Sequence, residues 1–429
     1  MAKTAKDIFD FSDISDECLK CGKCIPVCTI HSINADEVTS PRGFLELLGA
    51  YHKGNLELDK NVKDIFESCF LCTACIEVCP KLLPTDMVIE QVRADIAKKY
   101  GIAWYKRAFF FLLRHRKLMD LAFKFGYVFQ TCGFKIKKDI DSMHSRFSFP
   151  MLKVDRLLPS LRKKSFLNSY AENINNGGKR KVAIFIGCLS NYNYVDVGHG
   201  LLEILEKLEI DAFLAKSQKC CSAPAYFTGD FDTVDANAKY NIEYFESFSK
   251  DVEAIIVPEA TCSAMLKIDY EHYFHDQPEW KARAIALKDK IFMATEWLDK
   301  HTQLNELLAS KKKDTRIVTY HDPCHARKMQ GIHKEPRNLI SKNYNIVEMS
   351  DPNSCCGFGG VTMQSEKYHF SKAVGIPKAV MIKNTKADIV SSECSACRMQ
   401  INASMNYVDG SSAVFKNPIE LIADALKEN

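Results

Sequence analysis

The sequence predicts an α+β multidomain protein, in which an α-helical N-terminal module precedes two duplicated α/β lobes with parallel sheets. Three observations lead to this prediction. The chain has 429 residues, which is enough for two or three domains of about 150 residues each. Cysteines are concentrated in two tight runs near the N-terminus. Beyond them, a second cysteine pattern occurs twice, among β-rich stretches that alternate with helix-like ones.

Composition separates four expected domains. We expect a cysteine-dense domain at residues 1–99, a basic aromatic helical connector at 100–180, and α/β lobes at 181–312 and 313–429. The 18 cysteines are about 4% of the residues, below the roughly 8–10% that is typical of a disulfide scaffold. Because they are grouped at short spacings, they indicate metal ligation in a reducing compartment.

The sequence favours a cytoplasmic location. The N-terminal segment lacks the apolar stretch of a signal peptide. The longest purely apolar run, residues 108–113, is far shorter than the ~20 residues of a membrane-spanning helix. We therefore expect a cytoplasmic protein, for which peripheral attachment to the cytoplasmic face of the inner membrane stays open.

The N-terminal module contains two runs of the form Cys-x2-Cys-x2-Cys-x3-Cys, at residues 18–28 and 69–79. This is the spacing of bacterial two-cluster ferredoxins, in which each 4Fe-4S cluster takes three thiolates from one run and the fourth from the other. By that pattern the expected ligands are Cys18, Cys21, Cys24 and Cys79 for one cluster, and Cys69, Cys72, Cys75 and Cys28 for the other.

Details of these runs leave one alternative. The second run ends in Cys79-Pro80, as the ferredoxin motif requires, whereas the first ends in Cys28-Thr29. The alternative is a pair of four-cysteine zinc sites, which would need only two Cys-x2-Cys hooks each. Eight cysteines in two equal triplet-plus-one runs favour the clusters.

The region after residue 181 contains a repeat. Its landmarks are Cys188, which recurs 136 positions later as Cys324, the pair Cys220-Cys221, which recurs after 135 as Cys355-Cys356, and Cys262, which recurs after 132 as Cys394. Such regular offsets indicate duplication.

Each repeated cysteine follows a short apolar, β-rich run, and helix-like stretches lie between these runs. The expected strands are residues 182–186, 212–214, 255–257, 317–320, 346–347 and 389–390, and examples of the expected helices are 200–207, 232–249 and 365–383. Strands that alternate with helices form parallel sheets. Ligand-binding groups in such sheets gather beyond the carboxyl ends of the strands, so we expect the cysteines at one rim of each lobe.

The second lobe has five cysteines in its motifs: Cys324, Cys355, Cys356, Cys394 and Cys397. Adjacent cysteines rarely pair with each other, and a metal or cluster can bridge them. The glycines after Cys356 let the backbone approach a bulky inorganic ligand. His321, His325 and Arg327 flank the motifs. They could tune a cluster or move protons, but structural support of the ligands is the favoured role, since ligating sites routinely recruit such partners.

The first lobe is degenerate. It keeps Cys188, Cys220, Cys221 and Cys262, but Met265 occupies the fifth position and Ser222 follows the cysteine pair. Four thiolates could hold a cluster or a zinc ion. Alternatively, they are ordinary buried cysteines.

The connector is strongly basic and aromatic. Residues 101–181 contain 18 Lys or Arg against 5 Asp or Glu, and aromatic residues interleave with the basic ones up to residue 129. Three readings fit: an amphipathic helix at a membrane surface, a helix against a partner subunit, or a helix over this protein's own core. Nucleic-acid binding is disfavoured, because no recognition fold accompanies the charge. Cys132 lies outside every motif and is read as an ordinary thiol.

The five-cysteine motifs resemble the cysteine-rich "CCG" family of heterodisulfide reductase subunits and of iron-sulfur subunits of membrane-bound dehydrogenases. The resemblance implies a third 4Fe-4S cluster, of the non-cubane type, in the second lobe. The chain has two cluster runs with Thr-Ser-Pro-Arg-Gly between them at 39–43, then the connector, and then two CCG repeats. This order of segments is similar to that of three proteins. These are the iron-sulfur subunit of glycolate oxidase, the corresponding iron-sulfur subunit of anaerobic glycerol-3-phosphate dehydrogenase and the lactate-utilisation iron-sulfur protein.

This resemblance implies an electron-transfer subunit of an oxidoreductase. A separate FAD subunit would oxidise a 2-hydroxy acid or glycerol 3-phosphate, and this chain would relay electrons toward a membrane quinone. The sequence has no Gly-x-Gly-x-x-Gly run, so we expect the carbon chemistry on the partner. A thiol-disulfide oxidoreductase acting at the CCG cluster is the alternative, and a redox sensor or scaffold is a third reading.

Overall fold

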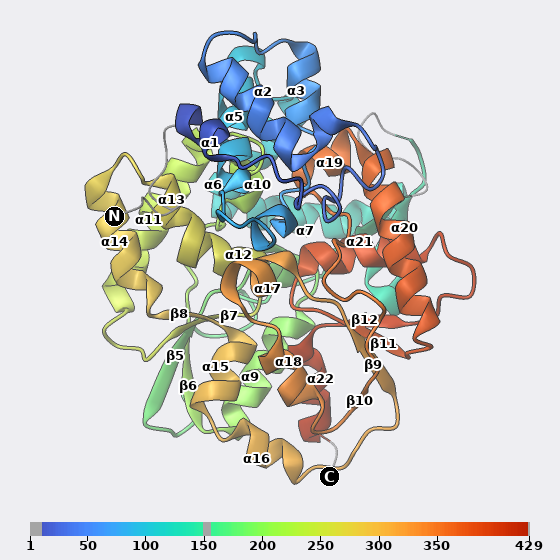
Figure 1. Cartoon of the computed structure of the whole chain (residues 1–429). Coiled ribbons are helices and arrows are strands. Elements are labelled where there is room, and N and C mark those ends of the chain that lie inside the picture. The colour runs from blue at the N-terminus through green and yellow to red at the C-terminus, as the bar shows by residue number, and fades with distance from the viewer. Residues whose placement is uncertain (1–10, 149–155, 428–429) are drawn as a thin grey trace.

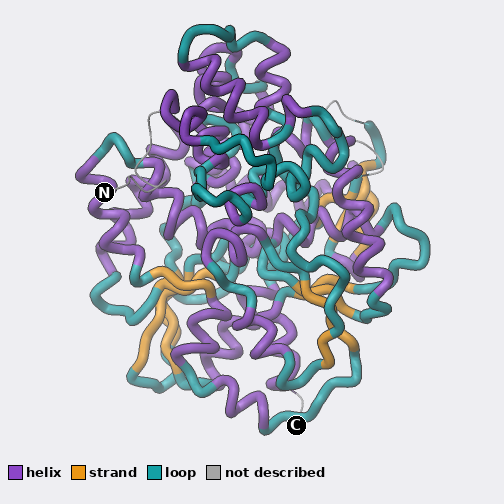
Figure 2. Tube along the Cα trace, viewed as in Figure 1, coloured by secondary structure: helices purple, strands orange, loops and turns teal. Residues whose placement is uncertain are grey.

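The computed structural model describes residues 11–148 and 156–427. Figure 1 shows the N-terminal module at the top, above two α/β lobes that lie side by side. Figure 2 shows the strands in three separate groups, which correspond to three sheets. The predicted fold class is therefore confirmed, with one additional sheet that the sequence did not predict.

The N-terminal module is helical, and no strand occurs in its described residues, 11–99. Its core contains Phe44, Leu48 and Phe66. The segment between the cysteine runs starts a helix, because the Ser40 hydroxyl accepts a hydrogen bond from the Gly43 backbone N–H (3.0 Å). A Cβ on Gly43 would lie 2.0 Å from a backbone oxygen. The helices are α1 (Phe11–Glu17), η2 (Glu37–Thr39), α2 (Pro41–His52), α3 (Lys60–Phe66), α4 (Ala74–Glu77) and α5 (Thr85–Tyr100).

The first lobe contains a five-stranded sheet in the order β4-β6-β5-β7-β8. Only β4 is antiparallel to its neighbour. The strands are β4 (Asn173–Ile174), β5 (Arg180–Ile184), β6 (Ile210–Leu214), β7 (Ile255–Val257) and β8 (Ile291–Met293). The helices are α8 (Cys188–Tyr192), α9 (Asp196–Lys207), α10 (Ala223–Tyr226), α11 (Phe231–Phe248), α12 (Ala260–Ala264), η4 (Met265–Asp269), α13 (Tyr270–Tyr273), α14 (Pro278–Lys288), α15 (Ala294–His301) and α16 (Leu304–Ala309).

The second lobe repeats this architecture with four parallel strands in the order β10-β9-β11-β12, which matches β6-β5-β7-β8 of the first lobe. The strands are β9 (Ile317–Tyr320), β10 (Asn345–Ile346), β11 (Ile389–Ser391) and β12 (Val414–Lys416). The helices are α17 (Cys324–Gln330), α18 (Lys334–Ile340), α19 (Gly360–Ser365), α20 (Tyr368–Asn384), α21 (Ser395–Met405) and α22 (Pro418–Lys427).

The two lobes share one hydrophobic core. Ile184 of β5 and Leu201 of α9 belong to the same buried cluster as Tyr320 of β9 and Leu421 of α22. The loops after β7 and β11 also bond to each other, because the Ala260 N–H donates to the Glu393 carbonyl at 2.8 Å. Equivalent strand ends of the two lobes therefore meet.

The connector consists of two helices, α6 (Trp104–Arg114) and α7 (Arg116–Gly133), followed by an antiparallel sheet of β1 (Phe134–Lys137), β2 (Ser142–Ser145) and β3 (Leu157–Pro159), with η3 (Lys138–Ile140) between β1 and β2. It is therefore not purely helical, and the prediction of a helical connector holds only for its first part. Phe110, Leu113 and Met119 join the core of the first lobe. The reading that the connector covers this protein's own core therefore holds for one face. Within residues 11–148 and 156–427, no helix is long and apolar enough to cross a membrane.

Candidate functional site

The N-terminal cysteines surround two small voids. The first void, site A, is lined by Cys18, Cys21, Cys24, Cys75 and Cys79; the second, site B, is lined by Cys28, Cys69, Cys72 and Cys75. Each void thus meets cysteines of both runs, and Cys75 lines both voids. The ferredoxin spacing predicts that the runs cross in this way and assigns Cys75 to site B.

Left-handed residues curl the cysteine loops around these voids. Lys20 and Gly22 in the first run have φ of 54° and 76°, and Leu71 and Thr73 in the second have 52° and 56°. Residues other than glycine rarely adopt positive φ, and such strain concentrates at functional sites. Four converging sulfurs around a void are the donor set of a 4Fe-4S cluster, so the residues fit that group.

Site B lies deeper than site A. Cys28 and Cys72 are buried, whereas Cys21 is exposed. Burial raises the pKa of the Cys28 thiol to about 11 and that of the Cys69 thiol to about 12. A buried thiolate needs compensating positive charge, which coordinated metal supplies. Thr29, where the ferredoxin motif has proline, brings its hydroxyl to 3.2 Å from the Cys72 sulfur.

The second-lobe site collects the five predicted cysteines from three strand ends. Cys324 begins α17 after β9, Cys355 and Cys356 follow β10, and Cys394 and Cys397 lie at the start of α21 after β11. Four of the thiols interact in series, Cys355 with Cys356, Cys356 with Cys397, and Cys397 with Cys394. The interaction with Cys356 and burial raise the pKa of Cys355 to about 12.

Glycines give the second-lobe loop its shape. Gly357 has a φ of +89°, and a Cβ there would lie 2.8 Å from the Ser371 carbonyl oxygen. Gly359 has a φ of +63°, and a Cβ would lie 2.8 Å from the Phe70 ring of the N-terminal module. Because only glycine fits these positions, the loop can pack closely against both neighbours.

The three flanking residues have different surroundings. Arg327 donates to the buried Asp322 carboxylate (2.5 Å). His325 lies 3.0 Å from the Thr261 hydroxyl, and its ring stacks on Phe227 with centroids 5.5 Å apart. Both contacts agree with structural support. His321 differs: it is buried, and in the described structure neither of its ring nitrogens has a hydrogen-bond partner.

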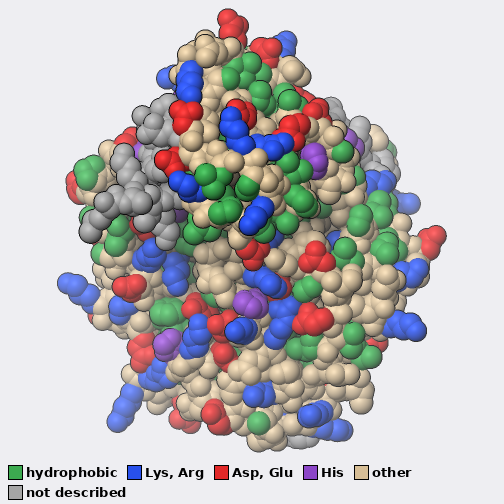
Figure 3. All heavy atoms as spheres, viewed as in Figure 1, with side chains coloured by type: hydrophobic (Ala, Val, Ile, Leu, Met, Phe, Trp, Pro, Cys, Tyr) green, Lys and Arg blue, Asp and Glu red, His purple; other side chains and the backbone are tan. Residues whose placement is uncertain are grey.

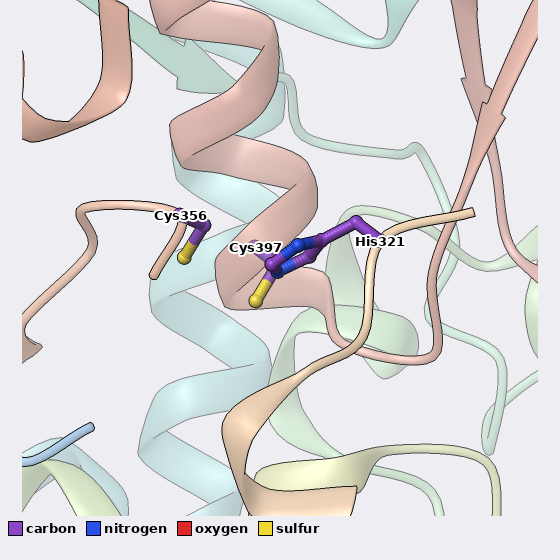
Figure 4. Close-up of side chains that lie close together, drawn as sticks. All are labelled: His321, Cys356 and Cys397. Carbon is purple, nitrogen blue, oxygen red and sulfur yellow. The ribbon is translucent and has the colours of Figure 1, made fainter. Parts of the chain in front are cut away.

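Figure 4 shows His321 beside Cys356 and Cys397. One ligand atom from each of these three residues lies within 4.8 Å of the other two, a grouping that could hold a metal ion. Burial holds the pKa of His321 well below its usual value, so the imidazole is neutral.

The first-lobe site brings its four predicted cysteines together. The Cys221 and Cys262 sulfurs are 3.3 Å apart, and Cys188 and Cys220 hydrogen-bond through their side chains. Met265, at the fifth position, is fully buried. Ser222 keeps the left-handed conformation of its counterpart Gly357, with a φ of 75°.

The cysteine sites form a contiguous series. Cys355 of the second-lobe site packs against the hydrophobic cluster that contains Cys72 of site B, and the interaction between the two thiols raises the pKa of Cys72. Both lobe sites open on one cavity of about 310 Å³, which Phe70 and Leu71 of the N-terminal module also line. Glu259 of the first lobe links the two lobes beside this cavity, because its carboxylate accepts a hydrogen bond from the Ser395 N–H of the second lobe at 2.9 Å.

Arg93 is a buried residue that the sequence reasoning did not identify. Its guanidinium donates to the carbonyls of Phe66 (3.2 Å) and Cys69 (2.7 Å) within the N-terminal module, and of Phe227 (2.9 Å) in the first lobe. It therefore fixes the loop of site B against the first lobe. Its sequence context gave no signal, because its three acceptors are backbone carbonyls.

Comparison with known proteins places these features in a family. A 4Fe-4S dicluster domain model matches residues 14–83, and a cysteine-rich domain model matches residues 182–267 and 318–402. The chain is 29% identical to the probable glycolate oxidase iron-sulfur subunit of Bacillus subtilis, over 90% of this chain and 87% of that protein. It is 31% identical to lactate utilization protein A of Bacillus cytotoxicus, over 52% of this chain and 90% of that protein.

Two further similarities are more distant. The fumarate reductase (CoM/CoB) of Methanothermobacter marburgensis has a subunit that is 29% identical over 84% of this chain and 62% of that protein. The crystal structure of a hypothetical protein from Helicobacter pylori shares the fold, with a TM-score of 0.53, 11% identity, and coverage of 99% of this chain and 76% of that one. The chain therefore belongs to the family of iron-sulfur proteins, with a 4Fe-4S dicluster domain followed by two cysteine-rich domains, that includes the glycolate oxidase iron-sulfur subunit and lactate utilization protein A.

Proposed function

We propose that this chain is the electron-transfer subunit of a dehydrogenase that oxidises glycolate, lactate or glycerol 3-phosphate on a separate FAD subunit, and that it passes the electrons toward quinone. The contact between Cys72 and Cys355 carries this proposal. It joins site B directly to the second-lobe site, so a carrier in one would adjoin a carrier in the other. The names of the relatives support a multisubunit oxidoreductase.

The proposed ligands follow the cysteine groupings. Sites A and B would each hold a 4Fe-4S cluster on four cysteines, and the second-lobe site would hold a third, non-cubane cluster on five. When bound, such clusters supply one-electron carriers, whose potentials depend on hydrogen bonds to sulfur and on solvent exposure. For the first-lobe site, a cluster or a zinc ion on four thiolates is proposed.

The partner subunit is proposed to dock over site A. Cys21 is the exposed cysteine of this site. Two large apolar side chains beside it are also exposed, Leu19 by 60% and Leu82 by 58%. The fully buried centre of a protein–protein interface is more apolar than its rim. A partner bound here would adjoin site A, the end of the series nearest to solvent.

An anaerobic purification through a tag on this chain, with iron, zinc and flavin counted, tests the proposal. About twelve iron atoms, as three 4Fe-4S clusters require, or about sixteen if the first-lobe site also holds a cluster, are expected together with a stoichiometric FAD protein. The Leu82→Asp variant should lose the flavoprotein and keep its iron. Ile285→Asp, at an apolar side chain 44% exposed on the first lobe, is the matched control. Iron without any flavoprotein would contradict the proposed partner.

A membrane surface is the proposed site of attachment of the connector. One face of α6 and α7 is exposed and apolar, through Trp104, Phe111, Leu118, Leu121, Phe125, Val128 and Phe129. Exposed basic residues lie along the same helices: Arg107, Arg114, Lys117 and Lys124. This combination suits a helix pair that lies on a bilayer with anionic lipids. On the face drawn in Figure 3, by contrast, acidic and basic side chains are interspersed.

Cosedimentation with vesicles tests this attachment. The protein should bind vesicles that contain phosphatidylglycerol, and replacement of Leu121, Phe125 and Phe129 by serine should remove most of the binding. Ile285→Ser, at an exposed apolar residue outside the connector, should bind like the original chain. If the triple variant sediments with vesicles as well as the original chain does, the connector is not the attachment site.

The cavity between the lobes favours a second candidate, thiol-disulfide oxidoreduction at the second-lobe site. Cysteines of both lobes line this space of about 310 Å³, which is otherwise mostly apolar and could admit a small disulfide. Met265 in place of a fifth cysteine argues against a second full site facing it. Reduction of a disulfide by the isolated chain would support this candidate over the electron relay.

A further inference from the structure

His321 is a buried imidazole with no partner for either nitrogen among the described residues. It is 1% exposed, and neither Nδ1 nor Nε2 makes a hydrogen bond. Buried polar groups are nearly always hydrogen-bonded or coordinated, so an orphaned imidazole indicates a partner that protein atoms do not supply. The side chain lies beside thiols rather than among apolar residues alone (Figure 4).

The geometry suits coordination. A ring nitrogen of His321 and the sulfurs of Cys356 and Cys397 all lie within 4.8 Å of one another. Tetrahedral ligands bound to one ion at about 2.0–2.3 Å lie about 3.5–3.8 Å apart, so shifts of up to about 1 Å would bring all three onto one metal. The three residues come from different elements: His321 follows β9, Cys356 lies in the loop after β10, and Cys397 lies in α21.

The repeat supplies an independent observation. At the offsets of the cysteine landmarks, His321 corresponds to Phe185, Cys356 to Cys221, and Cys397 to Met265. The first lobe therefore keeps one of the three ligand types and has apolar side chains, both fully buried, at the other two positions. The imidazole and the fifth thiol are present together in one lobe and absent together from the other.

The neighbouring histidine does not share these features. His325 corresponds to Leu189 in the first lobe, but it has partners in the protein, since it lies 3.0 Å from the Thr261 hydroxyl and stacks on Phe227. Its place is explained by packing between the lobes. His321 has no such explanation.

We propose that His321 is a nitrogen ligand of the metal centre in the second lobe, bound beside Cys356 and Cys397. This inference rests on the proposed function, because it requires a metal centre in that lobe. It adds a histidine to a donor set otherwise made of thiolates. Neutral imidazole, unlike a thiolate, carries no negative charge, so it would raise the potential of the centre relative to an all-thiolate set.

Pulsed electron paramagnetic resonance on the purified full chain tests the ligand. The signal of the second-lobe centre is first identified as the one that Cys356→Ser removes. That signal should show the strong hyperfine coupling of a directly bonded nitrogen, and the coupling should change to the ¹⁵N pattern when the original chain is labelled with ¹⁵N-histidine. The labelling needs no substitution, so it stays informative if a variant fails to fold.

Two variants sharpen the test. His321→Gln should lose the nitrogen coupling, whereas the control His325→Gln should keep it. A second-lobe signal without bonded histidine nitrogen, or with only the weak coupling of a hydrogen-bonded one, would overturn the inference and leave the proposed function intact. If no signal or iron depends on Cys356, the second-lobe centre does not exist, and both the inference and that part of the proposed function fail.

Discussion

The first and second lobes carry their cysteines on equivalent strands, β6-β5-β7 and β10-β9-β11, but the two rims are built differently. The first rim has four thiols, two of them with sulfurs 3.3 Å apart, and its fifth position is the buried apolar Met265. The second rim has five thiols, the unpartnered His321 and a glycine loop with positive φ. Duplication preserved four parallel strands in the same order, whereas the residues at the two rims differ.

Charge separates the lobes as well. In the second lobe, the ammonium groups of Lys328 and Lys378 interact with the thiols of Cys355 and its neighbours. The buried carboxyl of Glu259 lies near thiols of both lobes, Cys188 of the first and Cys394 of the second. A thiolate cluster carries negative charge, so nearby cations favour it and a nearby carboxylate disfavours it. The two lysines therefore make the second lobe the better anion site.

Replacement of one cysteine by serine in each lobe should give the largest difference between the lobes. Cys356→Ser should remove the second-lobe centre, with a loss of about four of about twelve iron atoms, because serine is a poor ligand for iron. The ferredoxin-type signals of sites A and B should persist. Iron analysis and electron paramagnetic resonance measure both.

Cys221→Ser, at the equivalent position of the first lobe, is the matched control for this exchange. It should leave the second-lobe signal unchanged. If all signals persist in Cys356→Ser, the ligand assignment is wrong. If Cys221→Ser removes the same signal, the two lobes hold one shared centre across the cavity and are not two separate sites.

Substitution of a glycine in the second-lobe loop should have an effect of intermediate size, on the free energy of unfolding. Gly357→Ser copies the first lobe, where Ser222 holds a φ of 75° and accepts a hydrogen bond from Asn237 (3.0 Å). In the second lobe the new Cβ would lie 2.8 Å from the Ser371 carbonyl oxygen. We expect a loss of about 2–4 kcal/mol in the free energy of unfolding, from left-handed strain plus the clash. Urea denaturation followed by circular dichroism measures it.

Gly331→Ser isolates the strain from the clash. Gly331 has a φ of +73°, but a Cβ there would meet nothing within 4 Å. Its substitution should therefore cost only about 1–2 kcal/mol, which is the strain of the left-handed conformation. Equal losses for the two variants would mean that close packing of the Gly357 loop contributes nothing to stability.

Much of this architecture could be predicted from local patterns. The strands before Cys188, Cys324 and Cys394 lie where the β-rich runs predicted them, because buried parallel strands read as continuous apolar stretches. Both N-terminal cysteine runs meet at each of two voids, as the ferredoxin spacing predicts, for a similar reason. Fixed short spacings leave a loop few ways to bring three sulfurs together.

Features that depend on docking between distant segments could not be predicted. The contact between Cys72 and Cys355, and the hydrogen bonds of Arg93, join segments whose sequences contain no mutual signal. The sheet of β1, β2 and β3 was missed because β1 and β2 lack the continuous apolar run that marks the strands of the lobes. His321 was one of three flanking residues in the sequence, and only burial without a partner distinguishes it.

A change in the contacts by which a lobe holds the N-terminal module should give the smallest effect, a change in the pH dependence of stability. The second lobe uses an ion pair between Lys367 and Asp64. On the side of the first lobe, Glu90 of the module is buried near Asp269, and burial followed by the Asp269 charge raises the pKa of Glu90 well above 4.5. The stability that Glu90 contributes is fully present below pH 4.5 and is lost as the pH rises toward its folded pKa, because the charged form is disfavoured there.

Glu90→Gln should flatten this dependence, since the amide can still accept a hydrogen bond from Tyr226 and carries no charge. We expect the midpoint of thermal unfolding to fall less between about pH 5 and about pH 8 in the variant than in the original chain, with the two closest at the acidic end. Glu172→Gln, at an exposed carboxyl of the first lobe, should change nothing. If Glu90→Gln instead keeps the full pH dependence, the module is not held to the first lobe by a protonated carboxyl, and the contrast with the ionic contact to the second lobe is lost.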